Sequence, residues 1–257
     1  MADGARRLTE TFRDAGRPLL IPYMMGGFPT LDASREVARA LSPHADILEL
    51  GIAFSDPLAD GPTVQAAGQT ALDAGVTTGD VVRLAGELAD GPPLVTMTCL
   101  NLVMAPGPDA FMRDLAEAGV SGLIVSDLPC DEGADLRRAA HEHGVAMISL
   151  VAPTTTDERL AQVAEVAEGF VYCVSVTGVT GGAVSIDDDL ETFVGRVKAA
   201  IDLPVVVGFG VQTPEHAARI GGFADGVVVG SQLVRVIESE GAAAAGELAG
   251  RMAAALR

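Results

Sequence analysis

Three carboxylates lie close together between residues 47 and 63, a stretch that reads ILELGIAFSDPLADGPT. Glu49 has apolar neighbours on both sides, so if this run is a strand its carboxyl group points into a largely dry interior. Burial disfavours the charged carboxylate and raises its pKa toward neutrality, where the group can both accept and donate a proton. Asp60 lies in a polar, glycine-containing loop and is expected to stay ionised. Two carboxylates in contrasting environments are typical of sites that divide acid and base roles between them.

Two glycine-containing segments near the C-terminal end predict a phosphate site. Gly208 and Gly210 follow one apolar run, and Gly230 and Ser231 follow the next. Glycine lets backbone N–H groups approach a ligand closely, although a plain tight turn also explains it. Ser231 begins a predicted helix, whose N-terminus favours an anion. Neither segment contains Arg or Lys, so a bound phosphate would rest on amides and a helix dipole.

The loop from Thr177 to Ser185 is long for a connection between a strand and a helix, and it is rich in glycine and threonine. These features indicate a mobile lid. An ordinary surface loop is the alternative.

The sequence lacks the residues that other aldolase or hydrolase mechanisms would need at the strand ends. Lys198, the only lysine, lies within a predicted helix, so a Schiff-base mechanism has no lysine at a strand end. None of the four histidines follows a predicted strand, which leaves a metal-dependent aldolase or hydrolase without ligands. Cys99, Cys130 and Cys173 form no CxxC pair. Carboxylates remain, with Tyr172 as a possible helper.

The elements that must position these groups alternate regularly. Eight apolar strand candidates are each followed by a helical pattern, which predicts parallel βαβ units. Eight units along residues 1–257 favour a single-domain α/β fold, the closed (β/α)8 or TIM barrel, with its active site at the C-terminal ends of the strands. No GxGxxG follows the first strand, which counts against a dinucleotide-binding fold. The predicted strands are Leu19–Met24, Asp46–Leu50, Leu94–Thr98, Gly122–Asp127, Ala146–Val151, Phe170–Val176, Val205–Phe209 and Gly226–Val229.

Two helices are predicted outside this repeat. An extra helix over Arg6–Ala15 precedes the first strand, and a short extra helix over Ser231–Ser239 follows the last one, before an alanine-rich helix over Ala243–Leu256.

Composition limits the partners and the compartment. The formal net charge of −18 and the pI near 4.4 argue against nucleic acid, because such a binding face needs clustered Lys and Arg. An odd number of scattered cysteines favours a reducing cytoplasm over a disulfide framework. No signal peptide and no run long enough to span a bilayer is evident, so no membrane association is expected.

With Glu49, Asp60, GVTG at 178–181, GFG at 208–210 and GS at 230–231 in view, the chain resembles the tryptophan synthase α subunit family. The segment ELGIAFSDPLADGPT is close to that family's signature, and the motifs occur in the same order along the whole chain. The resemblance implies a lyase that cleaves indole-3-glycerol phosphate by retro-aldol chemistry to indole and glyceraldehyde 3-phosphate. It implies no metal or organic cofactor, since pyridoxal phosphate would belong to a partner β subunit in an αββα assembly.

The resemblance also implies residue roles. Glu49 corresponds to the acid/base that protonates indole C3 and accepts the proton of the glycerol hydroxyl. Asp60 corresponds to the carboxylate that accepts a hydrogen bond from the indole N–H, and Tyr172 to a tyrosine near the glycerol. The remaining implied substrate-binding positions are Tyr23, Ile124 and Phe209 around the indole ring, Gly181, Gly210, Gly230 and Ser231 around the phosphate, and Thr180 and Gly208 beside them.

The chain departs from the family at a few positions. Ala53 stands where the family usually has proline, Cys99 stands where a tyrosine is common, and Phe28 replaces a usually polar or tyrosine residue. These positions surround the face that meets the β subunit, so they concern docking rather than catalysis. For Asp56 and Asp127, structural capping and subunit contact both remain open.

Three alternatives to a partnered lyase remain. A stand-alone lyase that releases free indole is favoured by the altered docking face. A catalytically idle barrel retained as an allosteric partner is disfavoured by the intact pair of Glu49 and Asp60. Another phosphate-binding barrel, such as a sugar-phosphate isomerase, would need the GFG and GS segments but not the ADGP stretch.

Overall fold

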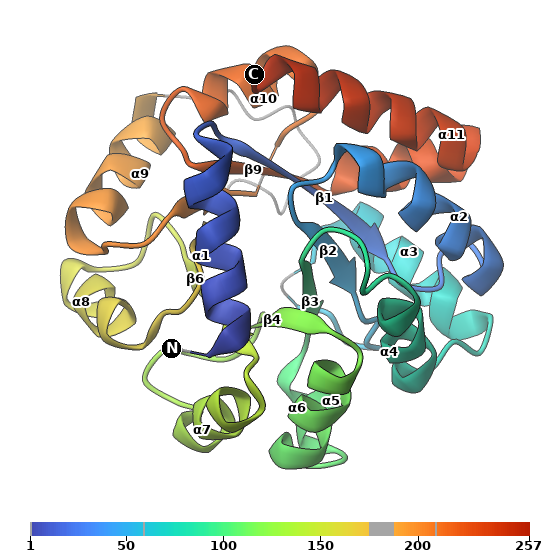
Figure 1. Cartoon of the computed structure of the whole chain (residues 1–257), viewed down its shortest axis with the longest axis horizontal. Helices are drawn as coiled ribbons and strands as arrows, with labels where there is room; N and C mark the ends of the chain where they lie inside the picture. Colours follow the sequence, from blue (N-terminus) through green and yellow to red (C-terminus); the bar gives the residue numbers. More distant parts are fainter. Residues whose placement is uncertain (1, 59, 175–187, 209) are drawn as a thin grey trace.

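The computed structural model describes residues 2–58, 60–174, 188–208 and 210–257 (Figure 1). Its strands are β1 (Leu19–Met25), β2 (Leu48–Gly51), β3 (Leu94–Thr98), β4 (Val120–Val125), β5 (Ala146–Met147), β6 (Ser149–Val151), β7 (Val171–Cys173), β8 (Val205–Val207) and β9 (Gly226–Val229). Its helices are α1 (Asp3–Ala15), α2 (Leu31–Leu41), the 3-10 helix η1 (Ser42–His44), α3 (Pro62–Asp73), α4 (Thr78–Glu87), α5 (Leu100–Met104), α6 (Pro108–Glu117), α7 (Ala134–His143), α8 (Asp157–Val166), α9 (Asp188–Ala200), α10 (Pro214–Gly221) and α11 (Ser231–Ala255).

The strands form one parallel sheet in the order β5-β4-β3-β2-β1-β9-β8-β7-β6. The two ends of this order, β5 and β6, are consecutive in the chain and are separated only by Ile148. β5 pairs with β4 and β6 pairs with β7, so the chain itself closes the barrel at this point. The predicted (β/α)8 barrel is therefore confirmed, with one correction: the strand predicted over Ala146–Val151 is two short strands.

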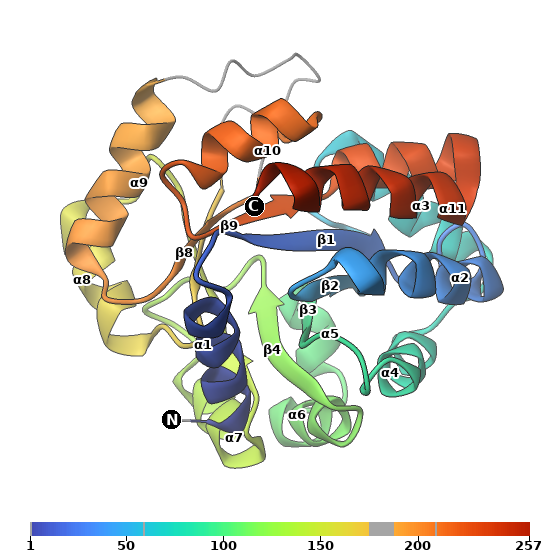
Figure 2. The same ribbon diagram turned by 45° about the horizontal axis from the view of Figure 1, so that its top comes forward.

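The predicted N-terminal helix is confirmed as α1, which lies across the end of the barrel at which β4 begins (Figures 1 and 2). Gly4 donates its backbone N–H to the carbonyl oxygen of Gly144 at 2.8 Å. A Cβ atom at Gly4 would lie 2.0 Å from the backbone oxygen of Ser121. Leu8, one turn further on, is fully buried. α1 thus covers the end of the barrel opposite the C-terminal ends of the strands.

The two predicted C-terminal helices are confirmed as the two segments of α11. α11 is broken at Gly241, whose φ of 84° and ψ of −172° are not helical. The break separates a first segment that follows β9 from an alanine-rich segment that lies beside α2 (Figures 1 and 2). Glycine suits the position because a positive φ costs it little.

Helix α5 was not predicted, because five residues are too few to show helical periodicity. Its first backbone N–H, that of Leu100, donates to Oδ1 of Asp127 at 2.7 Å. This contact supports the capping alternative for Asp127, which follows β4.

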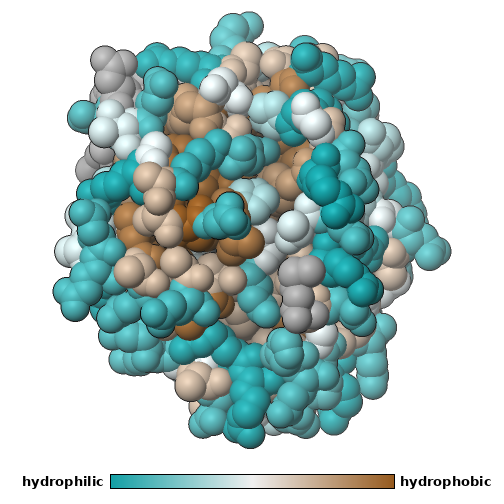
Figure 3. Space-filling model, turned by 60° about the vertical axis from the view of Figure 1, so that its left-hand side comes forward, coloured by the Kyte–Doolittle hydropathy of each residue, from teal (hydrophilic) through white to brown (hydrophobic). Residues whose placement is uncertain are grey.

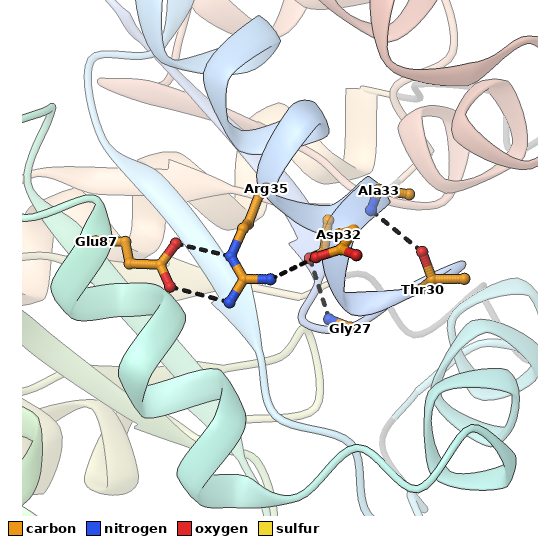
Figure 4. A network of polar contacts seen from close by, with 7 residues as sticks. Gly27, Thr30, Asp32, Ala33, Arg35 and Glu87 are labelled. Carbon is orange, nitrogen blue, oxygen red and sulfur yellow. Dashed lines mark hydrogen bonds and ion pairs between the residues drawn. The ribbon is translucent and has the colours of Figure 1, made fainter.

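A polar network fixes the segment that follows β1 (Figure 4). Thr30 caps α2 by accepting the backbone N–H of Ala33 at 3.2 Å. Arg35 binds Glu87 of α4 with two hydrogen bonds of 2.8 and 3.0 Å and also pairs with Asp32. The network joins the start of α2 to α4 on the outside of the barrel.

On the face shown in Figure 3, hydrophilic side chains form most of the outline, and hydrophobic ones gather toward its upper left. Across the described ranges, none of the helices has the length and apolar character that crossing a membrane requires.

We expect Gly4→Ala to lower the free energy of unfolding by about 1–3 kcal/mol, because the new methyl group would meet backbone atoms that cannot move aside cheaply. Urea-induced unfolding followed by circular dichroism measures this change. Gly195→Ala, on the exposed side of α9 with open space around it, is the control and should raise stability by roughly 0.5–1 kcal/mol. Equal effects at the two glycines would contradict the described packing of α1.

Candidate active site

The strand register places the predicted catalytic glutamate inside the barrel. Glu49 of β2 pairs with Tyr23 of β1 on one side and with Val95 of β3 on the other. Paired residues of parallel strands share a face, and alternate residues along a strand return to that face. Glu49 is 1 % exposed, so its side chain lies in the barrel interior as predicted.

The burial of Glu49 determines its protonation state. Neither of its carboxyl oxygens has a hydrogen-bond partner within the described ranges. Removal from water raises the pKa of Glu49 to about 8, and the nearby charge of Asp60 adds to the effect. At pH 7 the group is therefore mostly a neutral carboxylic acid, able to donate a proton and then to accept one.

Asp60 lies just before α3, in a turn that holds it over the barrel. Its backbone N–H donates to the carbonyl oxygen of Pro57 at 3.2 Å, and its own carbonyl oxygen accepts the side-chain amide of Gln65 at 2.8 Å. The side chain is less solvated than the loop composition predicted, and burial raises the pKa of Asp60 to about 6. Asp60 is still mostly ionised at pH 7, so the two carboxyl groups differ in protonation state.

Two tyrosines complete the interior, and each is seated against a glycine. A Cβ atom at Gly51 would lie 2.2 Å from the hydroxyl oxygen of Tyr23, and one at Gly208 would lie 2.0 Å from that of Tyr172. Glycine is required at both positions because no side chain fits beside the rings. Burial raises the pKa of both phenols, and the charges of Glu49 and Asp60 raise them further. Glu49, Asp60, Tyr23 and Tyr172 thus form one interacting group.

Ile124 lies on the same inner face. Its register partner is Met97 of β3, which pairs with Gly51, two residues beyond Glu49 on β2. Ile124 is fully buried, as expected for a wall of an apolar pocket.

The predicted phosphate segments lie at the C-terminal ends of β8 and β9. Gly210 has a φ of +71°, which glycine adopts readily. A Cβ atom at Gly230 would make only ordinary van der Waals contact, at 3.8 Å from Tyr23. Ser231 begins α11, where the first backbone N–H groups of a helix have no intrahelical acceptor. The three remaining predicted site residues, Thr180, Gly181 and Phe209, lie outside the described residues, as does the predicted lid over 177–185.

Lys198 and His143, two of the groups excluded in the sequence analysis, lie away from this site. Lys198 pairs with Asp225 at 2.9 Å, beside the start of β9. His143, in the last turn of α7, pairs with Asp109 at 2.8 Å. In the part of the chain that the structure describes, no group of three or more His, Cys, Asp or Glu side chains is arranged to hold a metal ion.

Comparison with known proteins decides the family. A family model described as tryptophan synthase alpha chain matches residues 10–255. The chain belongs to the tryptophan synthase alpha chain family. The tryptophan synthase alpha chain of Carboxydothermus hydrogenoformans is 46% identical to it over 88% of this chain and 86% of that protein. The alpha chain of a Roseiflexus species is 43% identical over 90% of this chain and 92% of that protein.

Solved structures of the tryptophan synthase family share the fold. A structure of Mycobacterium tuberculosis tryptophan synthase superposes with a TM-score of 0.93 at 42% identity, covering 100% of this chain and 99% of that one.

One residue of the site, and one long-range contact outside it, were missed from the sequence. Gly51 lies in the stretch from residue 47 to residue 63. A glycine inside a strand often marks a place where another group packs closely against the backbone, and this signal would have identified Gly51 as the position against which a side chain packs. Arg235 lies one turn beyond Ser231 and donates to Gln232 at 3.0 Å and to Thr63 at 3.4 Å. This contact joins α11 to the start of α3 across 172 residues, and no local pattern announces it.

The burial of Glu49 predicts a pH-dependent stability difference between the wild type and Glu49→Gln. The folded pKa of about 8 exceeds the ordinary value of 4.5, so the unfolded chain loses this proton first as the pH rises. The wild type therefore loses stability between about pH 4.5 and 8, whereas glutamine cannot ionise. The stability of Glu49→Gln relative to the wild type should rise by up to roughly 5 kcal/mol across this window.

Urea unfolding of both proteins at pH 5, 7 and 9 measures the difference, with Glu238→Gln, an exposed position on α11, as the control for loss of one carboxylate. If the difference in the free energy of unfolding between the wild type and Glu49→Gln stayed constant from pH 5 to 9, the Glu49 carboxyl group would not be buried away from water.

Proposed function

We propose that the chain cleaves indole-3-glycerol phosphate to indole and glyceraldehyde 3-phosphate, the lyase reaction of its family. One observation supports this most strongly: Glu49 is 1 % exposed inside the barrel and lies near enough to Asp60 for the charge of Asp60 to help raise its pKa. A retro-aldol cleavage of an indole needs both a proton donor that becomes a base and a separate fixed anion.

In the proposed reaction, Glu49 first gives its proton to indole C3. The ring becomes cationic, and Asp60 stabilises it by accepting a hydrogen bond from the ring N–H. The bond from C3 to the glycerol carbon then breaks, and its electron pair restores the aromatic indole. The proton of the glycerol hydroxyl passes to the Glu49 carboxylate as the aldehyde forms. Glu49 ends the cycle protonated, as it began.

These steps require only side chains and backbone groups of the protein. The protonated indole accepts the electrons of the breaking bond, so the substrate supplies its own electron sink and we propose that no metal or organic cofactor takes part. Tyr172 would contact the glycerol, Tyr23 and Ile124 would flank the ring, and the backbone N–H groups around Gly230 and Ser231 would hold the phosphate.

We further propose that the chain works with a tryptophan synthase β subunit. The large hydrophobic side chains that the described residues leave exposed are Leu58, at 92%, and Met104, at 55%. Leu58 follows β2 and Met104 ends the helix that follows β3, so both lie beyond the C-terminal ends of neighbouring strands, where the barrel opens. Apolar side chains in such positions suit a protein interface.

Turnover should depend on both carboxylates. We expect Glu49→Gln to reduce kcat by at least about 10³-fold, because it removes the group that serves as acid and then as base. Asp60→Asn should reduce kcat about 10²-fold through loss of charge opposite the cationic ring. Release of indole from indole-3-glycerol phosphate by the purified chain measures both.

The same assay with an added β subunit separates the two functional hypotheses. Strong activation supports the partnered enzyme, and high activity without it supports a stand-alone lyase. Near-wild-type cleavage by Glu49→Gln would refute the proposed mechanism in either case.

The pH profile of kcat/KM should be bell-shaped. The reacting form has Asp60 ionised and Glu49 protonated, so activity should fall below about pH 6 and above about pH 8. Because the groups interact, the two limbs report the pair rather than either residue alone. Asp60→Asn should remove the acidic limb and lower the basic one, since the charge of Asp60 helps to raise the pKa of Glu49. A profile that is flat from pH 5 to 9 would contradict the assignment.

A further inference from the structure

Tyr23 has a hydroxyl group that the proposed mechanism does not use. Its ring is a suitable wall for an indole, but phenylalanine would serve that purpose equally well. The hydroxyl oxygen lies 4.0 Å from Sδ of Met25, and a thioether sulfur is only a weak acceptor. A buried phenolic O–H usually finds a stronger partner.

Glu49, in turn, lacks a hydrogen-bond donor. Its carboxyl oxygens have no partner in the described ranges, although the proposed reaction makes the group an anion at mid-cycle. A bare carboxylate in a dry interior is costly unless a donor reaches it. The barrel must supply such a donor, or the first proton transfer is opposed by the full cost of an unpartnered charge.

The geometry brings the two groups together. Tyr23 and Glu49 are register partners on adjacent strands and share the inner face. The Tyr23 hydroxyl lies against Gly51, which is two residues beyond Glu49 on the same face, or about 6.6 Å along the strand. The missing side chain of Gly51 seats the hydroxyl there. A glutamate side chain extended along the strand toward Gly51 would bring its carboxyl group to this hydroxyl.

We propose that Tyr23 is a positioning residue whose hydroxyl donates a hydrogen bond to the ionised carboxylate of Glu49. The proposal rests on the proposed function of Glu49 and adds to it the group that stabilises its charged form. Two other ionisable groups face Glu49: Asp60, from the turn before α3, opposes its ionisation, and Tyr172 approaches from β7, across the barrel. In the proposed mechanism Tyr172 contacts the substrate glycerol, which among the described phenols near Glu49 leaves Tyr23 as its donor.

The variant Tyr23→Phe tests this proposal because it keeps the ring and removes only the hydroxyl. Loss of a donor to the charged form should raise the pKa of Glu49 by about one unit. The basic limb of kcat/KM should move upward by the same amount, and kcat should fall about tenfold with KM nearly unchanged. A merely structural role for Tyr23 would lower stability without moving the limb in this direction.

Carbon-13 NMR titration of the Glu49 carboxyl group, assigned with Glu49→Gln, gives the pKa without any turnover. It therefore tests the hydrogen bond even if the proposed reaction is wrong. Thr96→Val is the matched control: it removes a buried hydroxyl from β3 that faces away from Glu49, since Thr96 pairs with Leu50. An upward shift with Tyr23→Phe alone supports the proposal. An unchanged or lowered pKa of Glu49 in Tyr23→Phe, or equal shifts in both variants, would overturn it.

Discussion

The site depends on the cost of placing one carboxyl group in a dry interior where the described residues offer it no hydrogen bond. Burial keeps Glu49 neutral near pH 7, while Asp60, less deeply placed, stays ionised beside it. Asp60 reinforces the difference, because its negative charge makes a second charge at Glu49 still less favourable. The proposed lyase chemistry follows from this contrast, since a protonated acid and a fixed anion are the two groups that a cationic indole requires.

The barrel provides this contrast through close packing rather than through bonds to the carboxylates. Parallel strands aim Glu49, Tyr23 and Tyr172 into one interior, and glycines on β2 and after β8 leave space for the two phenol rings. Helix α1 covers the opposite end, so the interior has one mouth. The family comparison agrees with this arrangement over nearly the whole chain.

Much of this could be predicted from the sequence, because it depends on local pattern. Apolar runs and helical periodicity predicted the barrel, and the apolar neighbours of Glu49 in the sequence predicted that its side chain is buried. Features that depend on distant segments could not be predicted in this way: the break at Ile148, the short helix α5 that Asp127 caps, and the bond from Arg235 to Thr63 all depend on three-dimensional packing. The burial of Asp60 was underestimated for the same reason, since loop composition does not reveal what the loop lies against.

Neutron diffraction from crystals of the full chain in deuterated buffer near pD 7 would test the central claim directly, because it locates individual hydrogen isotopes. The account predicts a deuterium atom on a carboxyl oxygen of Glu49 and none on Asp60, with Glu49 inside the barrel. A bare Glu49 carboxylate, or the same protonation state on both groups, would contradict it.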